Sequence, residues 1–152
     1  VIHDFWDFDV FKQSCKRHGL NRHRVKLITA LGMFYDLEDP MGFIGDISKA
    51  LADDGIFVAQ LMCLESMLEQ NDLGHICHEH LEFYSFDSLK YLFENNGLEI
   101  YKIVENKVNG GSYRIFARHF VTGSMIKEEK SNYESILSFK ERIDRNKKAC
   151  VS

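Results

Sequence analysis

The stretch that decides the fold runs from Val25 to Met62 and reads VKLITALGMFYDLEDPMGFIGDISKALADDGIFVAQLM. It begins with a nearly continuous β-branched and aliphatic run, Val25–Leu31, and it ends with a second one, Ile56–Met62. Runs of this length and composition are typical of strands that are buried on both faces, as parallel strands are. The sequence therefore predicts two buried parallel strands.

A helix is predicted between these two strands. The apolar residues that recur there at helical spacing are Phe43, Ile44, Ile47, Ala50 and Leu51. Residues 41–52 are therefore interpreted as an amphipathic helix. Asp53-Asp54-Gly55 ends it, and Gly55 suits a left-handed cap. Strand, helix and strand with short links make a βαβ unit with a right-handed crossover.

The rest of the chain predicts an antiparallel ending. Residues 65–84 are polar and irregular, and residues 87–95 form a helix that stops at Asn96-Gly97. Two alternating strands, 98–104 and 112–119, are joined through Asn109-Gly110-Gly111, which is a hairpin signal. A charged helix is expected from about 127 to 148. The fold class is α/β: a parallel βαβ unit, then an antiparallel C-terminal hairpin and a tail helix.

Composition narrows the class of protein. The 152 residues carry a net charge of −4 with acids and bases interspersed, which argues against a nucleic-acid binder. No apolar run approaches the roughly 20 residues that a membrane span needs, and no signal peptide is visible at the start. Four scattered cysteines form no CxxC pair, which favours reduced thiols and a cytoplasmic location.

The densest polar cluster is His75-Ile76-Cys77-His78-Glu79-His80. One interpretation is a general acid/base pair, in which a histidine oriented by a carboxylate takes a proton from a substrate. A second is a metal site made by His75, His78 and His80, although the spacing is not that of an HExxH motif. A third is a polar surface loop. From the residues alone, all three stay open.

Two further segments are candidates for ligand binding. In Asn109–Arg114, the glycines let a backbone pass close to a ligand and Arg114 can hold a phosphate, although a plain hairpin turn explains the pattern equally well. In Thr29–Pro40, a buried strand leads into a Gly-Met-aromatic segment. Such residues can line a flat cofactor, and they are also ordinary core residues.

Taken together, four segments resemble the S-adenosylmethionine (SAM)-dependent C-methyltransferases that act on nucleotide-linked deoxysugars. The segments are Met33–Pro40 (MFYDLEDP), Ala52–Gln60 (ADDGIFVAQ), His75–Ser85 (HICHEHLEFYS) and Asn109–His119 (NGGSYRIFARH). Their order and spacing agree with that family, and the HEHLEFYS element is the most specific. The resemblance covers roughly residues 1–120, and it implies a partial Rossmann-like methyltransferase sheet.

The resemblance also implies roles for individual residues. His80 is expected to be the general base and Glu79 its partner, so that the substrate carbon beside a keto group loses a proton and then takes the methyl group of SAM. The expected substrate-binding residues are His78, Tyr84, Gly110, Gly111, Ser112 and Arg114. The expected cofactor-binding residues are Ala30, Met33 and Phe34. The resemblance implies no metal.

Some family features are not present in this sequence. The Gly-rich turn after a first strand, the acid that ends a second strand and the zinc-binding cysteine cluster are all missing, and Cys77 stands where some members have tyrosine. We therefore expect residues 1–122 to be the C-terminal portion of the methyltransferase domain and residues 123–152 to start a following segment. An exposed strand edge invites homodimer formation. The alternative function is a non-catalytic fold that binds a nucleotide sugar or only self-associates.

Overall fold

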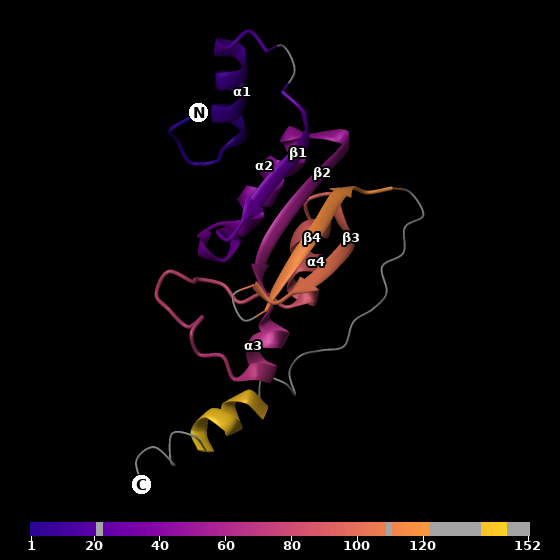
Figure 1. Cartoon of the computed structure of the whole chain (residues 1–152). Helices are drawn as coiled ribbons and strands as arrows, with labels where there is room; N and C mark the ends of the chain where they lie inside the picture. Colours follow the sequence, from indigo (N-terminus) through magenta and orange to yellow (C-terminus); the bar gives the residue numbers. More distant parts are fainter. Residues whose placement is uncertain (21–22, 109–110, 122–137, 146–152) are drawn as a thin grey trace.

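The computed structural model describes residues 1–20, 23–108, 111–121 and 138–145. Over these residues the chain forms a mixed sheet in the order β1-β2-β4-β3 (Figure 1). Its strands are β1 (Val25–Leu31), β2 (Leu51–Met62), β3 (Leu98–Asn106) and β4 (Ser112–His119). β1 and β2 are parallel, whereas β4 runs antiparallel to both of its neighbours. The predicted α/β class, with a parallel βαβ unit followed by an antiparallel hairpin, is confirmed.

The helices come before, between and after these strands. They are α1 (Phe8–Arg17), the short 3-10 helix η1 (Phe34–Asp36), α2 (Pro40–Ala50), α3 (Leu64–Gln70) and α4 (Phe86–Glu94). Residues 138–145 are also helical, within the predicted tail helix, and the other residues of that prediction from 127 to 137 and from 146 to 148 lie outside the described ranges. None of the described helices has the length and apolarity to cross a membrane.

The core lies between the sheet and the pair of helices α2 and α4. On β2, Phe57, Ala59 and Leu61 are almost completely buried, whereas Ile56, Val58 and Gln60, which alternate with them, are half-buried. The Phe57 ring stacks on Phe93 of α4, with 5.9 Å between the ring centroids. Ile44 and Ile47 of α2 belong to the same cluster. The described helices α2 and α4 therefore cover one face of the sheet and leave the other more open.

The predicted burial of β1 on both faces is wrong. Leu27 and Leu31 are each 60% exposed, while Ala30, which points to the opposite face, is buried. β1 is one of the two edge strands of the described sheet, and Ala30 is the one residue of this strand that is buried. An apolar run alone cannot separate a strand buried on both faces from an edge strand with one uncovered face, because both have the same composition.

The predicted role of Gly55 as a left-handed cap is also wrong. α2 ends at Ala50, and Leu51 already belongs to β2, where it pairs with Val25. The next pair is Leu27 with Ile56, so residues 52–55 bulge out of the ladder. A Cβ atom on Gly55 would lie 2.9 Å from the Val25 carbonyl oxygen. Glycine is needed there for the close approach of two strands.

Helix α3 falls within the stretch that the sequence predicts to be irregular. Its N-cap is Cys63, whose sulfur accepts the Ser66 N–H at 3.4 Å, and it ends at Asn71 in the left-handed conformation with φ of 52°. Cysteine is not among the usual N-cap residues, and seven residues offer too little periodicity to recognise. α4 and the two hairpin strands lie within two residues of their predicted bounds.

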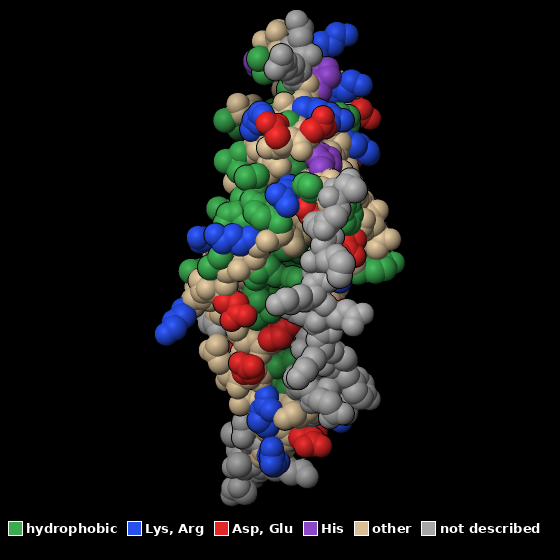
Figure 2. Space-filling model, turned by 90° about the vertical axis from the view of Figure 1, so that its right-hand side faces the viewer, with side chains coloured by type: hydrophobic (Ala, Val, Ile, Leu, Met, Phe, Trp, Pro, Cys, Tyr) green, Lys and Arg blue, Asp and Glu red, His purple; other side chains and the backbone are tan. Residues whose placement is uncertain are grey.

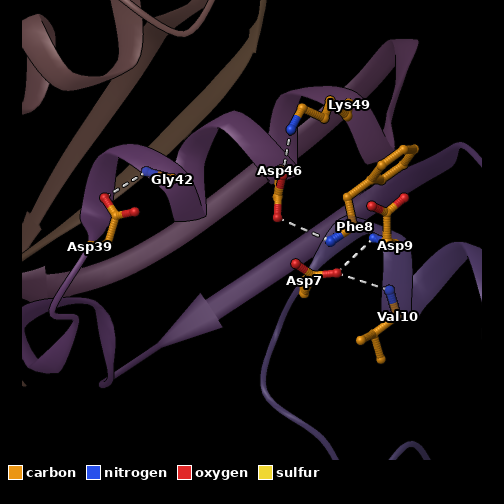
Figure 3. Close-up of polar contacts among 8 residues, drawn as sticks. All are labelled: Asp7, Phe8, Asp9, Val10, Asp39, Gly42, Asp46 and Lys49. Carbon is orange, nitrogen blue, oxygen red and sulfur yellow. Dashed lines mark hydrogen bonds and ion pairs between the residues drawn. The ribbon is translucent and has the colours of Figure 1, made fainter.

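Aspartates fix the starts of α1 and α2 (Figure 3). The Asp7 carboxylate accepts the N–H groups of Asp9 and Val10 at 2.8 and 3.0 Å, and that of Asp39 accepts the Gly42 N–H at 2.9 Å. Asp46 on α2 accepts the Phe8 N–H at 3.1 Å and pairs with Lys49 at 2.7 Å. Asp46 therefore links the beginning of α1 to α2.

We predict that Asp39→Ala lowers the free energy of unfolding by about 1 kcal/mol, because the first turn of α2 loses its side-chain acceptor. Urea denaturation followed by circular dichroism measures the change. Asp39→Ser keeps an acceptor at the cap and is expected to retain most of the stability. Equal stability of Asp39→Ala and the unmodified chain would contradict the capping role.

Candidate active site

The segment with the histidines lies in the loop between α3 and α4, and it is fastened to the residues that follow β1. The Tyr35 carbonyl oxygen accepts two backbone N–H groups of this loop, from Leu81 at 2.9 Å and from Glu82 at 3.2 Å. Since β1 and β2 are parallel, their carboxyl ends lie at the same edge of the sheet. Open α/β sheets bind their ligands at that edge. The loop therefore lies where a ligand is expected.

His80 is held in one defined orientation. Its Nδ1 lies 2.8 Å from the His75 carbonyl oxygen, and its ring contacts the Tyr35 ring at 4.4 Å between centroids. A carbonyl oxygen only accepts hydrogen bonds, so Nδ1 carries the proton of the neutral imidazole. Nε2 then has the lone pair. The arrangement leaves His80 able to take a proton through Nε2.

His78 and Glu79 point to solvent. The Glu79 carboxylate lies 3.4 Å from His78 Nε2. The His78 side chain is 90% exposed and the Glu79 side chain 67% exposed. The contact that the structure shows for Glu79 is therefore with His78, on the outer side of the loop. Both groups remain accessible to a ligand, and the partnership of Glu79 with His80 stays a prediction.

The three histidines and the nearby acids do not form a metal site in this conformation. Within the described ranges, no group of three or more histidine, cysteine, aspartate or glutamate side chains is arranged to hold a metal ion. His75 instead pairs with Asp72, at 3.4 Å between Nε2 and Oδ2, and its ring stacks near that of His80.

Tyr84 lies in the core beneath this loop. Its ring contacts Phe34, with 5.3 Å between centroids, and the side chain is 7% exposed. Its hydroxyl is buried and has no hydrogen-bond partner among the described residues. Burial, and to a smaller extent the Glu82 carboxylate, raise the pKa of the Tyr84 phenol far above its ordinary value. The hydroxyl therefore stays protonated and can donate.

The glycine segment packs a strand onto a helix. Gly111 has a φ of 134°, and a Cβ atom there would lie 2.5 Å from the Ser66 Cβ of α3. Its carbonyl oxygen accepts the Cys63 N–H at 3.3 Å, and the Ser112 hydroxyl donates to the Val108 carbonyl at 2.7 Å. Only glycine allows this close approach of β4 to α3. Gly110 lies outside the described residues.

Arg114 is exposed on β4, where it reaches across to β2. Its Nε and Nη2 atoms donate to the Gln60 side-chain oxygen at 3.2 and 2.8 Å. This contact uses the planar edge of the guanidinium that also suits a phosphate. Because Gln60 is neutral, Arg114 keeps an uncompensated positive charge in this pairing.

Sequence reasoning missed the residue that ties these elements together, Glu65. Its carboxylate accepts the Tyr113 hydroxyl at 2.8 Å, the Phe86 N–H at 3.4 Å and the Cys63 thiol at 3.5 Å. Burial is the first cause that raises the pKa of the Tyr113 phenol, and the hydrogen bonds to Cys63 and Glu65 add to it. Glu65 therefore joins α3 to β4 and to the start of α4. A glutamate after a strand gives no sequence signal for partners so distant in the chain.

Comparison with known proteins decides the family. A family model described as a methyltransferase domain matches residues 2–103. The chain belongs to this methyltransferase family. It is 33% identical over 109 residues to the C-methyltransferase NovU of Streptomyces niveus. The matched region covers 72% of this chain and 25% of NovU. The chain therefore spans about a quarter of the length of that curated relative.

Solved structures agree with the fold of this methyltransferase domain. A chain of a complex that contains the Trm112 methyltransferase activator of Haloferax volcanii superposes with a TM-score of 0.54 at 13% identity, over 68% of this chain and 57% of the other. LepI in complex with SAM superposes with a TM-score of 0.50 at 10% identity, over 64% of this chain and 27% of LepI. At these identities the likeness establishes the Rossmann-like methyltransferase fold alone.

The expected cofactor residues of the methyltransferase domain lie at the end of β1 and differ in exposure. Phe34 is fully buried and packs against Phe43, with 5.8 Å between ring centroids. Ala30 is buried, whereas Met33 is half-buried. Gly32 lies between Ala30 and Met33 and has a φ of 68°. Of the three predicted residues, Met33 is the one whose side chain reaches the surface.

Two tyrosines offer a matched test of this polar network. We predict that Tyr113→Phe lowers the free energy of unfolding by about 1–3 kcal/mol, because the Glu65 carboxylate loses its hydroxyl donor. Tyr84→Phe is expected to be neutral or stabilising, since it removes a buried hydroxyl without a partner in the described structure. Urea denaturation of both variants measures the difference. Equal losses would contradict the assignment of Glu65 as the centre of the network.

Proposed function

We propose that this chain is the proton-abstracting part of a SAM-dependent C-methyltransferase whose substrate is a nucleotide-linked deoxysugar with a keto group. The observation that carries the proposal is the hydrogen bond from His80 Nδ1 to the His75 carbonyl, because it leaves the lone pair on Nε2. Similarity to a C-methyltransferase supports the same chemistry. Carbon methylation needs such a base, since a C–H bond must first lose its proton.

The accessible polar groups support a charged, hydroxylated substrate. Arg114 offers a guanidinium edge to a diphosphate, and the exposed pair His78 and Glu79 can hydrogen-bond sugar hydroxyl groups. These groups come from the loop after α3 and from β4. We propose that the nucleotide sugar binds along this edge of the sheet.

The described residues fit one wall of a SAM site. At the end of β1, Gly32 has no side chain to block a ligand, and the half-buried Met33 offers a polarisable surface for a flat ring. Ala30 contributes the strand end beneath them. When bound, SAM supplies the electrophilic methyl group. Residues that hold its other side are not among those described.

The chain's own residues account for the proton transfer. His80 Nε2 takes the proton from the carbon beside the keto group, so that the C–H bond breaks, an N–H bond forms and the electron pair moves to the keto oxygen as an enolate. A buried donor stabilises that oxyanion, and Tyr84 has a protonated hydroxyl available for the purpose. SAM, held beside Ala30 and Met33 at the end of β1, would supply the methyl group for this carbon.

We predict that the chain exchanges the proton beside the keto group of a nucleoside-diphosphate keto-deoxysugar in D₂O, because this half-reaction needs only the base and the substrate. Proton NMR of the sugar measures the exchange rate. His80→Gln is expected to lower the rate by about 10²- to 10⁴-fold, the usual contribution of a general base.

His18 provides the matched control for this experiment. Its Nδ1 also lies 2.8 Å from a carbonyl oxygen, that of Ser14, but His18 is the C-cap of α1 and lies outside the histidine loop. His18→Gln is expected to keep the exchange rate. Isothermal titration with S-adenosylhomocysteine tests cofactor binding separately. Exchange that persists in His80→Gln, or that the unmodified chain does not accelerate, would refute the proposed role of His80 in this chain.

Self-association is a second candidate function, and the exposed side of β1 favours it. Leu27 and Leu31 are each 60% exposed on a strand at the edge of the described sheet. The opposite edge is better protected, since Lys102 lies over the Phe116 ring and Arg118 over the Tyr101 ring. On the side of the molecule drawn in Figure 2, charged side chains surround the hydrophobic ones. Unprotected edges pair with other chains.

We predict that the chain forms a homodimer through β1 and that Leu27→Lys shifts it toward the monomer, because a charge on an edge strand opposes pairing. Size-exclusion chromatography with light scattering measures the mass. Leu20→Lys, at a residue 57% exposed beyond α1, is the control and is expected to leave the mass unchanged. A monomeric unmodified chain would exclude this candidate.

A further inference from the structure

We infer that Asp72 and His75 are positioning residues for His80, and that the Asp72 carboxylate determines which ring nitrogen of His80 is free to accept a proton. The inference rests on the proposed function, in which His80 is the base. It goes further because it assigns a role to two residues that do not themselves contact the reacting carbon.

The Asp72 carboxylate holds both ends of a tight turn. One oxygen accepts the Gly74 N–H at 2.8 Å, and the other lies 3.4 Å from His75 Nε2. The backbone N–H of Asp72 itself donates to the Met67 carbonyl at 3.0 Å, next to the left-handed Asn71 that ends α3. The turn is thereby attached to a helix, and the helix is attached to the sheet through Glu65.

His75 transmits this position to His80 through its backbone and through its ring. Its carbonyl oxygen accepts the Cys77 N–H at 3.2 Å and His80 Nδ1 at 2.8 Å, so both of its lone pairs are used. Its side chain is 14% exposed, and its ring lies nearly parallel to that of His80, at 24° and 6.1 Å between centroids. A shift of His75 therefore moves the acceptor that fixes the His80 tautomer.

The charge of Asp72 is suited to this task. A carboxylate bonded to a histidine restricts the orientation of that ring, as in sites where a carboxylate orients a histidine ligand. Here the carboxylate orients the His75 ring, and the His75 ring in turn restricts the position of the neighbouring His80 ring. Asp72 is 29% exposed in its side chain, so the pair is only partly screened by water.

The tautomer of His80 can be measured without any enzymatic activity. In the chain labelled with ¹⁵N-histidine, at a pH where imidazole is neutral, long-range ¹H–¹⁵N spectra distinguish a protonated Nδ1 from a protonated Nε2. We expect His80 to have the proton on Nδ1. Asp72→Ala is expected to give a mixture of the two tautomers, because the turn loses the hydrogen bond to the Gly74 N–H and the contact of the carboxylate with His75.

Two further variants make the test specific. Asp39→Ala removes the same kind of carboxylate-to-amide bond from α2, away from the loop, and is expected to leave the His80 tautomer unchanged. His75→Ala removes the ring and the Asp72 partner but keeps the backbone carbonyl. It is expected to keep the tautomer largely as it is, yet to lower the proton-exchange rate by about 10- to 100-fold through the loss of orientation.

The two proposals fail in different ways. If His80→Gln leaves the exchange rate unchanged, the proposed function is wrong, whatever the tautomer spectra show. If His80→Gln abolishes exchange but Asp72→Ala keeps both the single tautomer and the rate of the unmodified chain, the positioning role of Asp72 is overturned and the base remains. Circular dichroism of each variant confirms that the fold is retained, and His75→Ala provides the second test should Asp72→Ala unfold.

Discussion

Two backbone N–H groups, of Leu81 and Glu82, converge on the carbonyl oxygen of Tyr35, and the site depends on this contact. Leu73, Ile76 and Leu81 of the loop between α3 and α4 are each about half exposed, so their packing fixes the loop only weakly. Backbone hydrogen bonds to a rigid neighbour compensate, since a buried donor without a partner costs more than a bond gains. Tyr35 is held in place because it belongs to η1, which begins three residues after the end of β1, and because Phe34 beside it is completely buried. The sheet therefore fixes the position of His80 through the hydrogen bonds between the loop and Tyr35.

A second constraint acts at the other end of the loop, where Glu65 collects three donors from different elements. A partly buried carboxylate is stabilised by a hydrogen-bond network only when all of the donors in that network are in place. Glu65 therefore requires β4 to be paired with β2 in one register, in which Tyr113 lies opposite Leu61. The antiparallel hairpin contributes only substrate contacts to the proposed mechanism. Through Glu65 it nevertheless holds the loop that contains His80 in shape.

The helices and strands whose apolar residues recur with a clear period could be predicted from the sequence. Features that depend on one particular contact could not. β1, α2, α4 and the hairpin follow from apolar spacing, and the histidine cluster from composition and resemblance. The end of α2 was predicted wrongly because Gly55 serves a strand bulge, which depends on the pairing of Val25 with Leu51. α3 has an unusual cap in Cys63 and too few residues for a pattern. Contacts such as those of Tyr35, Glu65 and the His75 carbonyl join backbone groups or distant residues, so no local pattern contains them.

The exposure of the residues around His80 suggests how the proposed chemistry is divided between the resting protein and the bound substrate. A base for carbon acids has to keep its lone pair free of protein donors and yet avoid competition from water. For the first requirement, the Nδ1 proton of His80 is used by the His75 carbonyl, which leaves the lone pair on Nε2, and the ring is half-buried against Tyr35. The second is left to the ligand, since His78 and Glu79 on the outer side of the loop are largely exposed. In the proposed function, a sugar bound there would exclude water from the lone pair of His80. In the proposed function, the orientation of the base is therefore built into the fold, whereas the dry environment would form only on substrate binding.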